Sequence, residues 1–305
     1  MDKVLVIAGP TAVGKTAFSI QCAKRFNGEI ISGDSMQVYR TLNIGTAKIK
    51  EEEMDGIKHH LIDVCDPDES YSVADFQKEG RQAIQEIIAK GKLPVIVGGT
   101  GLYLQALLYD FHLGGQEEKI PVAKKEELSQ FLKEQGRDAL WQRLFLQDEQ
   151  AAQAIHKNNE RRVLRALEVV ETTGKPFLQK EEQAPLYDHK LLILNTERET
   201  LYERINQRVD GMLEAGLLEE AKYVASLKKG TSRQSIGYKE FFPYFSGEQT
   251  LEEAVATLKQ NSRRYAKRQL TWFRNRFNGE WIDLLNQQPS EEEVFAMIEQ
   301  WLGGE

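Results

Sequence analysis

The sequence Val4-Leu5-Val6-Ile7-Ala8 leads directly into Gly9-Pro-Thr-Ala-Val-Gly14-Lys15-Thr16, and a helical pattern of apolar residues follows at once. This is the spacing of the phosphate-binding P-loop, G-x-x-x-x-G-K-[ST], placed between a strand and a helix. Its glycines let backbone N–H groups point inward and form an anion site at a helix N-terminus. Lys15 adds a positive charge, and the Thr16 hydroxyl can bind Mg²⁺. The stretch therefore predicts a polyphosphate site without identifying the polyphosphate.

Length and composition narrow the class of protein. The chain has 305 residues, of which 29% are charged and 41% hydrophobic, as is typical of a globular protein with one large or two moderate domains. No apolar run approaches the roughly 20 residues of a membrane span, and the N-terminus lacks a signal-peptide layout. Cys22 and Cys65 alone make neither a disulfide framework nor a zinc site. We therefore expect a cytoplasmic protein with no membrane partner.

Strand-like and helix-like segments alternate in the first part of the chain. Ser72 and Asp75 have the spacing of a capping box and begin a helical stripe that stops at Gly91. Apolar strand-like stretches lie at residues 3–8, 29–32, 59–64 and 93–97. The alternation predicts an α/β fold in which a parallel sheet has helices on both faces.

The pattern changes near Gly114, where Gly114-Gly115-Gln-Glu-Glu-Lys has the composition of a linker. Residues 122–182 are rich in charge, have helical periodicity and contain no obvious strand. A strand-like run returns at Leu191-Leu-Ile-Leu194, and helices follow at 198–228 (broken at Gly216), at 251–273 and after Ser290. We predict a P-loop α/β core formed by residues 1–114 and 188–305, interrupted by a helical insertion domain at 115–187.

Three predicted strand ends carry polar groups, and ligands of open α/β sheets bind at the carboxyl ends of strands. These are the P-loop, Asp34 after the second strand, and Thr100 after the 93–97 strand. The 93–97 strand ends in Val-Gly-Gly-Thr and lacks the acid that usually holds Mg²⁺ in P-loop nucleotide hydrolases. Asp34 is therefore the carboxylate placed to be a general base or a partner of the metal, although an aspartate there also commonly forms turns or caps helices.

Five motifs then occur in a specific order: GPTAVGKT at 9–16, SGDSMQVYR at 32–40, NIGTAK at 43–48, HHLIDV at 59–64 and VGGTGLY at 97–103. Together they resemble the tRNA dimethylallyltransferases. The resemblance continues through Arg162-Val-Leu-Arg165, Thr173-Gly-Lys-Pro, residues 204–213 and Ser235-Ile-Gly-Tyr238, and so covers nearly the whole chain. Eukaryotic relatives carry a C-terminal zinc finger, which two cysteines cannot form, so the resemblance is to the bacterial type.

The resemblance implies a P-loop kinase-like fold and a prenyl transfer. Dimethylallyl diphosphate would donate its dimethylallyl group to N6 of the adenosine 3′ to the anticodon, and diphosphate would leave. By family match, Asp34 would be the general base, Thr100 would orient the reacting groups, and Thr16 would bind the Mg²⁺. The diphosphate would be held by Gly9, Thr11, Ala12, Val13, Gly14, Lys15, Thr16 and Arg208.

The C-terminal third contains the features expected of an RNA site. Residues 259–279 contain seven basic and no acidic residues in a chain whose net charge is −7. Cations for a backbone and flat rings for stacking are what single-stranded RNA requires. Here these are Arg264, Lys267, Arg268, Arg274 and Trp272, together with Lys259, Arg263, Arg276, Tyr265, Phe273 and Phe277.

By resemblance, further contacts to the tRNA anticodon stem-loop would come from Ser35, Met36, Gln37, Gly237, Tyr238, Arg162 and Arg165. Family members usually have an Asn-Asp pair just before the segment that contains Arg162. This chain has Asn158-Asn159 instead, so no role is carried over for that acid.

Three other functions fit parts of the sequence. A P-loop small-molecule kinase would place ATP in the loop, but it leaves the basic region and the insertion unexplained. An adenylate isopentenyltransferase would use the same prenyl donor on free nucleotide, for which the basic region is not needed. A non-catalytic RNA-binding module would not need the P-loop, Asp34 and Thr100. We therefore predict a monomeric prenyltransferase that acts on tRNA.

Overall fold

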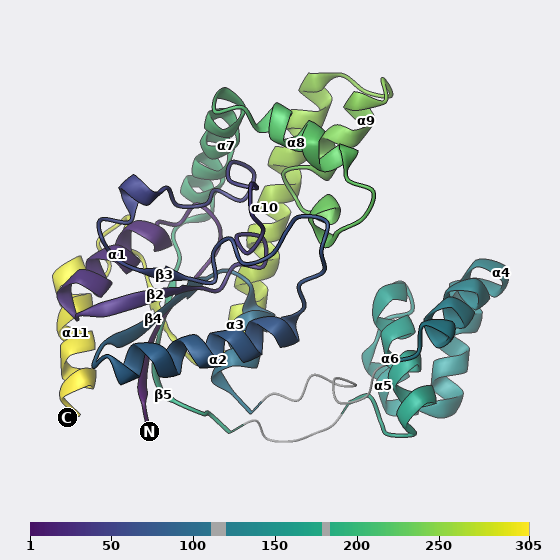
Figure 1. Cartoon of the computed structure of the whole chain (residues 1–305), viewed down its shortest axis with the longest axis horizontal. Coiled ribbons are helices and arrows are strands. Elements are labelled where there is room, and N and C mark those ends of the chain that lie inside the picture. Colours follow the sequence, from purple (N-terminus) through teal and green to yellow (C-terminus); the bar gives the residue numbers. More distant parts are fainter. Residues whose placement is uncertain (111–119, 179–183, 305) are drawn as a thin grey trace. The chain divides into compact units, whose positions relative to one another are not determined.

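The computed structural model describes residues 1–110, 120–178 and 184–304, so the linker-like stretch Gly114–Lys119 lies outside the described residues. The chain forms two compact units (Figure 1). An α/β unit comprises residues 1–109 and 185–305, and a helical unit comprises residues 110–184.

The α/β unit is built on a six-stranded sheet in the order β3-β2-β4-β1-β5-β6. All five strand pairs are parallel, which confirms the predicted α/β class. The strand bounds are β1 (Lys3–Ala8), β2 (Gly28–Ser32), β3 (His59–His60), β4 (Leu93–Gly98), β5 (Asp188–Leu194) and β6 (Glu280–Ile282). The P-loop strand β1 lies between β4 and β5, in the middle of the sheet.

Helices cover both faces of this sheet, as alternating side chains of each strand require. In β1, Val4 and Val6 point to one face and pack with residues of α2 (Val73–Ala89), α3 (Gly101–Leu108) and the end of α10 (Leu251–Arg276). Leu5 and Ile7 point to the other face and pack with α1 (Lys15–Arg25), α7 (Arg198–Glu214) and α11 (Glu291–Gly303). Figure 1 shows the sheet between these two layers.

A third apolar cluster lies beyond the carboxyl ends of the strands. It joins residues 38–42 to Cys65, Tyr238 and Phe241, and to helices α7, α8 (Leu217–Ser226) and the first half of α10. The short helix α9 (Phe242–Phe245) and the 3₁₀ turns Thr231–Gln234 and Lys239–Phe241 lie in the same region, and a further 3₁₀ turn is formed by Glu51–Glu53. This cluster anchors the loop that follows Asp34.

The helical unit contains α4 (Val122–Gln147), α5 (Glu149–Ala154) and α6 (Glu160–Thr173). Its core comprises Leu128, Leu140 and Leu144 of α4 packed against Val163 and Leu167 of α6. Helix α4 is interrupted at Gly136, whose φ of +80° is left-handed. Within the described part of this unit there is no strand.

Two strands differ from the sequence prediction. The strand predicted over residues 59–64 ends at His60, because Leu61 and Asp63 have φ values of +61° and +56° that turn the chain out of the sheet. The short edge strand β6 was not predicted, since three residues give too little periodicity to recognise. Among the described helices, none combines the length and apolar character needed to cross a bilayer.

Candidate active site

The P-loop turns from the end of β1 into α1 and borders a cavity. Gly14 stands at the N-cap of α1 with φ of +103°, a conformation that glycine adopts without strain. At Gly9 (φ +144°) a Cβ atom would lie 2.4 Å from the Leu194 carbonyl oxygen, so the loop also needs glycine there. The cavity has a volume of about 510 Å³ and is lined by Ala12, Val13, Gly14, Lys15, Thr16, Ala17, Arg204, Gln207 and Arg208.

Two half-buried cations, Lys15 and Arg208, line this cavity. Burial, reinforced by the neighbouring Arg208, lowers the pKa of Lys15 to about 7. Burial also lowers the pKa of Arg208, which forms no salt bridge within the described residues. Both cations are poorly solvated and close enough to repel each other, so a polyanion in the cavity would relieve both penalties. The Lys15 Nζ atom donates to the Pro10 carbonyl oxygen at 2.6 Å.

Asp34 and Thr100 come from neighbouring strand ends, after β2 and β4. The Asp34 carboxylate partly offsets the lowering of the pKa of both Lys15 and Arg208, so it lies within electrostatic range of the cavity cations. Its Oδ1 accepts the Met36 N–H at 2.8 Å. The Thr100 Oγ1 accepts the Ser35 N–H at 3.3 Å and lies 3.4 Å from the Ser35 hydroxyl. The predicted catalytic pair is thus brought together through Ser35.

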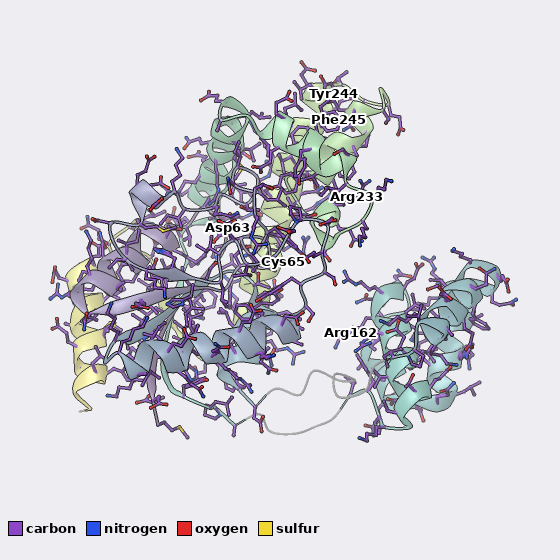
Figure 2. The ribbon with its side chains drawn as sticks, in the orientation of Figure 1. Asp63, Cys65, Arg162, Arg233, Tyr244 and Phe245 are labelled. Atoms are coloured by element: carbon purple, nitrogen blue, oxygen red, sulfur yellow. The ribbon has the colours of Figure 1, made fainter. Side chains whose placement is uncertain are left out.

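Glu220 of α8 anchors the loop that follows Asp34 through hydrogen bonds. The Glu220 carboxylate accepts the N–H groups of Asn43, Ile44 and Gly45 at 2.8–3.1 Å, and also the Tyr238 hydroxyl at 2.7 Å. Gly45 packs against the Tyr238 ring, where a Cβ atom would come within 2.5 Å. Lys48 adds hydrogen bonds to the Tyr39 carbonyl and to Asp63, which Figure 2 labels. Sequence reasoning had given Glu220 no role.

Several predicted contact residues are used internally. Tyr238 is 0% exposed and Gly237 donates its N–H to Glu240, so the Tyr238 side chain supports the loop and presents no surface to RNA. The Gln37 Oε1 atom accepts the Ser32 hydroxyl proton at 3.0 Å. The Thr11 N–H donates to the Gln269 Oε1 atom at 3.2 Å and so does not point at the cavity. Thr11 and Gly9 do not line the cavity, whereas the other predicted P-loop residues and Arg208 do.

Helix α10 presents a basic surface, which we define as Arg264, Lys267, Arg268, Arg274 and Arg276. All five are exposed, and none forms a salt bridge within the described residues. Arg276 lies 5.9 Å from the ring centre of the half-buried Trp272, and Arg268 lies 5.6 Å from that of Tyr265. Lys259 and Arg263 differ, because Lys259 pairs with Asp210 and Arg263 donates to Asn206.

Arg162 and Arg165 lie on α6 of the helical unit. Arg162 is exposed (Figure 2), while the half-exposed Arg165 pairs with Glu168 at 3.0 Å. The Asn159 side chain accepts the Arg162 N–H and caps the start of α6. The structure therefore gives Asn159 a clear helix-capping role.

The sequence analysis missed two polar residues of the cavity wall, Arg204 and Gln207. Arg204 and Arg208 are four residues apart on α7 and so lie on the same face of the helix. That spacing is the sequence signal that could have placed Arg204 beside Arg208. The Arg204 Nε atom also donates to the Ala12 carbonyl oxygen at 2.8 Å and thereby ties α7 to the P-loop.

Known proteins resemble this chain over nearly its whole length. A tRNA dimethylallyltransferase of Enterococcus faecalis is 59% identical over 99% of this chain and 98% of its own length. A tRNA dimethylallyltransferase of Bacillus subtilis is 51% identical over 97% of this chain and 96% of its own. The family model described as IPP transferase matches residues 37–276.

Solved structures agree with these sequence matches. The full-length tRNA isopentenylpyrophosphate transferase of Bacillus halodurans superimposes with a TM-score of 0.73 at 49% identity, covering 100% of this chain and 96% of that one. A eukaryotic dimethylallyltransferase acting on tRNA gives a TM-score of 0.86 at 33% identity, covering 100% of this chain and 80% of that one. With the P-loop cavity and the strand-end pair in place, these matches show that the chain belongs to the IPP transferase family.

Proposed function

We propose that this protein transfers the dimethylallyl group of dimethylallyl diphosphate to N6 of the adenosine 3′ to the anticodon in tRNA. The observation that carries the proposal is the P-loop cavity with two desolvated cations, Lys15 and Arg208, beside the strand-end pair of Asp34 and Thr100. The names of the full-length relatives support the reaction. As its substrate is tRNA, we propose that the protein acts in the cytoplasm, and we propose a monomer.

The cavity suits a diphosphate leaving group. When the allylic C1–O bond breaks, its electron pair passes to the diphosphate oxygen, and negative charge increases there. Cations and N–H groups that are already oriented lower the free energy of that transition state without reorganising. Lys15 and Arg208 are among the donors that line this cavity, and P-loop residues 12–16 line it as well.

The residues around the cavity fit Mg²⁺ only as an ion carried mainly by the substrate. No group of three or more His, Cys, Asp or Glu side chains within the described residues could hold a metal. Thr16 is exposed, lines the cavity and has no hydrogen bond from its hydroxyl within the described residues. Mg²⁺ usually keeps several waters and binds through few protein oxygens plus substrate phosphates. Bound there, it would neutralise charge on the diphosphate, with Thr16 as its protein ligand.

Asp34 and Thr100 provide what the acceptor amine needs. The N6 lone pair is delocalised into the adenine ring, so the new C1–N6 bond forms more readily if a base removes the N6 proton. Such a base contributes about 10²–10⁴-fold in rate. We assign that role to Asp34. Thr100 would orient the amine, since its hydroxyl is already hydrogen-bonded beside Asp34 through Ser35.

The basic surface of α10 suits the backbone of an anticodon stem-loop whose target base is turned outward. We also assign RNA contacts to Ser35 and Met36 on the Asp34 loop, and to Arg162 and Arg165 in the helical unit. Gln37, Gly237 and Tyr238 would act indirectly, because their polar groups or rings are used to hold that loop.

A mass measurement tests the proposal. The protein would be incubated with Mg²⁺, dimethylallyl diphosphate and an unmodified anticodon stem-loop carrying adenosine 3′ to the anticodon, with AMP in a parallel tube. We expect a gain of one dimethylallyl group on the RNA and none on AMP. Prenylation of AMP alone would favour an adenylate isopentenyltransferase. Consumption of ATP without prenyl transfer would favour a small-molecule kinase.

A further inference from the structure

One buried side chain connects the P-loop to the loop that carries Thr100. Gln269 of α10 is 6% exposed, and both ends of its amide are used. Its Oε1 accepts the Thr11 N–H at 3.2 Å, and its Nε2 donates to the Gly99 carbonyl oxygen at 3.0 Å. A Cβ atom on Gly99 would come within 2.1 Å of that Nε2, so the close approach requires glycine at 99.

This amide joins two loops that the sheet cannot align by itself. Strands β1 and β4 are paired only as far as Ala8 and Gly98, and the reacting groups lie beyond those residues. On the side of β2, the Thr100 loop is fixed by the hydrogen bond from Gly33 N–H to the Val97 carbonyl. On the side of the P-loop, Gln269 supplies the corresponding link. The donor side and the acceptor side of the reaction are thus connected through one glutamine.

Two neighbours of Gln269 on α10 also contact the loop that carries Thr100. Tyr265, one turn earlier, is a half-buried phenol whose pKa is raised to about 12, mainly by burial and then by the charge of Asp34, while contacts with Thr100 and Gln269 partly offset the shift. Trp272 packs on Gly101, where a Cβ atom would come within 2.1 Å of the indole ring. The helix therefore turns one face to the two loops and the opposite, basic face to solvent.

We propose that Gln269 is a positioning residue for prenyl transfer, which holds the P-loop and the Thr100 loop at the separation that the reacting C1 and N6 atoms require. The inference rests on the proposed prenyl transfer. Reacting atoms must approach to about 3–3.5 Å, and a misplacement of about 1 Å can cost about 10²-fold in rate. Gln269 is buried and does not line the P-loop cavity, so its loss should alter the transfer step more than the binding of the donor or the RNA.

The test compares Gln269→Leu with wild type in single-turnover transfer to the stem-loop at saturating donor and RNA. We expect the rate to fall by about 10- to 100-fold, with the affinities for inorganic diphosphate and stem-loop little changed. Gln82→Leu is the matched control, because Gln82 is an exposed glutamine whose amide donates to Glu86 within α2. Circular dichroism confirms that each variant is folded. A folded Gln269→Leu protein with the wild-type rate, or one whose diphosphate affinity falls as much as its rate, would overturn the proposal.

A second variant, Gln269→Glu, tests whether the hydrogen bond to the Gly99 carbonyl matters, which loss of packing alone would not reveal. In Gln269→Glu the carboxylate still accepts the Thr11 N–H but repels the Gly99 carbonyl, whereas the protonated acid can donate to it. We expect the ratio of variant to wild-type rate to rise as the pH is lowered from 8 to 5.5, since burial beside a carbonyl raises a carboxyl pKa above its ordinary value of about 4.3. A flat ratio would count against the hydrogen bond to Gly99.

Hydrogen exchange of the Thr11 amide provides a readout that does not depend on activity. In Gln269→Leu this N–H loses its acceptor and should exchange faster than in wild type, while Gln82→Leu should leave it unchanged. If wild type fails to transfer the prenyl group, the proposed function fails, yet the exchange result still decides whether Gln269 holds the P-loop. Unchanged exchange in Gln269→Leu would contradict that link.

Discussion

The α/β unit holds cations in two different environments, although phosphate is the expected partner of both. Lys15 and Arg208 face the P-loop cavity, and burial lowers the pKa of each. Arg264, Lys267 and Arg274 on α10 are exposed and form no salt bridge within the described residues. A desolvated pair gains most from a compact anion that fills its cavity, whereas solvated cations suit an extended backbone and are screened by salt. The two kinds of phosphate site therefore differ in how far their cations are exposed to solvent, although all these side chains are cationic.

The largest expected effect comes from Asp34, the carboxylate that acts on Lys15 and Arg208. Asp34→Asn keeps an acceptor for the Met36 N–H but cannot take the N6 proton, so single-turnover transfer should fall by about 10²–10⁴-fold. Donor affinity should change far less. Rapid-quench kinetics and titration calorimetry measure the two quantities, with the exposed, Arg40-paired Asp66→Asn as control. Equal losses in both would remove Asp34 from the role of base.

Arg208→Leu removes one of the two half-buried cations that line the cavity. We expect kcat/KM for dimethylallyl diphosphate to fall by about 10²–10³-fold, since an oriented charge at the leaving group is lost, while affinity for the stem-loop stays near wild type. Steady-state kinetics at saturating RNA and a fluorescence binding assay separate these results. Arg198→Leu, on the same helix but outside the cavity, is the control. A larger loss in RNA affinity than in kcat/KM for the donor would show that Arg208 binds the RNA and not the diphosphate.

Lys15 should also make donor binding depend on pH. With its pKa lowered to about 7, Lys15 is partly neutral in the free protein, and a bound diphosphate favours the charged form. Diphosphate affinity should therefore decrease as pH rises, by about fivefold between pH 7 and 8 if only the charged form binds. Calorimetry would be repeated on Lys15→Arg, whose guanidinium stays charged, so that ionisation of the ligand cancels. Parallel pH profiles for the two proteins would contradict the assignment.

RNA binding by the exposed cations of α10 should instead depend on the salt concentration. Lys267→Ala is expected to weaken stem-loop binding severalfold and to reduce the slope of log K against log[salt] by about 0.7, the value for one single-strand phosphate contact. Transfer at saturating RNA should be unaffected. Lys78→Ala, an exposed lysine on α2, is the control. If the slope is unchanged, Lys267 does not contact the RNA backbone.

Local signals in the sequence predicted much of the fold. The capping boxes at Ser72–Asp75 and Ser290–Glu293 are present as expected, because a cap needs only residues three apart. Strand β1 and the P-loop follow for the same reason. By contrast, the turn at Leu61 and Asp63 depends on tertiary packing that overrides an apolar pattern.

The candidate site was predictable where residues lie close in sequence and less so where they meet in space. Lys15 and Thr16 are recognisable from spacing alone. Gln269 is not, since a buried glutamine on a basic helix has the same sequence pattern as a solvated one, and only the contacts to Thr11 and Gly99 reveal it. The burial of Tyr238 against Gly45 was likewise hidden, because the two residues are far apart in the chain. The chemical roles of Asp34 and Thr100 stay predictions.

The chain leaves the α/β unit after α3 and re-enters it before β5 at adjacent points. Tyr109 bridges to Pro185, and the Leu186 N–H donates to the Leu108 carbonyl oxygen at 2.9 Å. Exit and entry are thus fastened together whatever lies between them, and the entropy of closing a longer loop grows only slowly with its length. In evolutionary terms this joint is a permissive insertion point: the segment between can lengthen, shorten or be exchanged while the sheet keeps its register. Changes in this segment should therefore cost the folding of the sheet little.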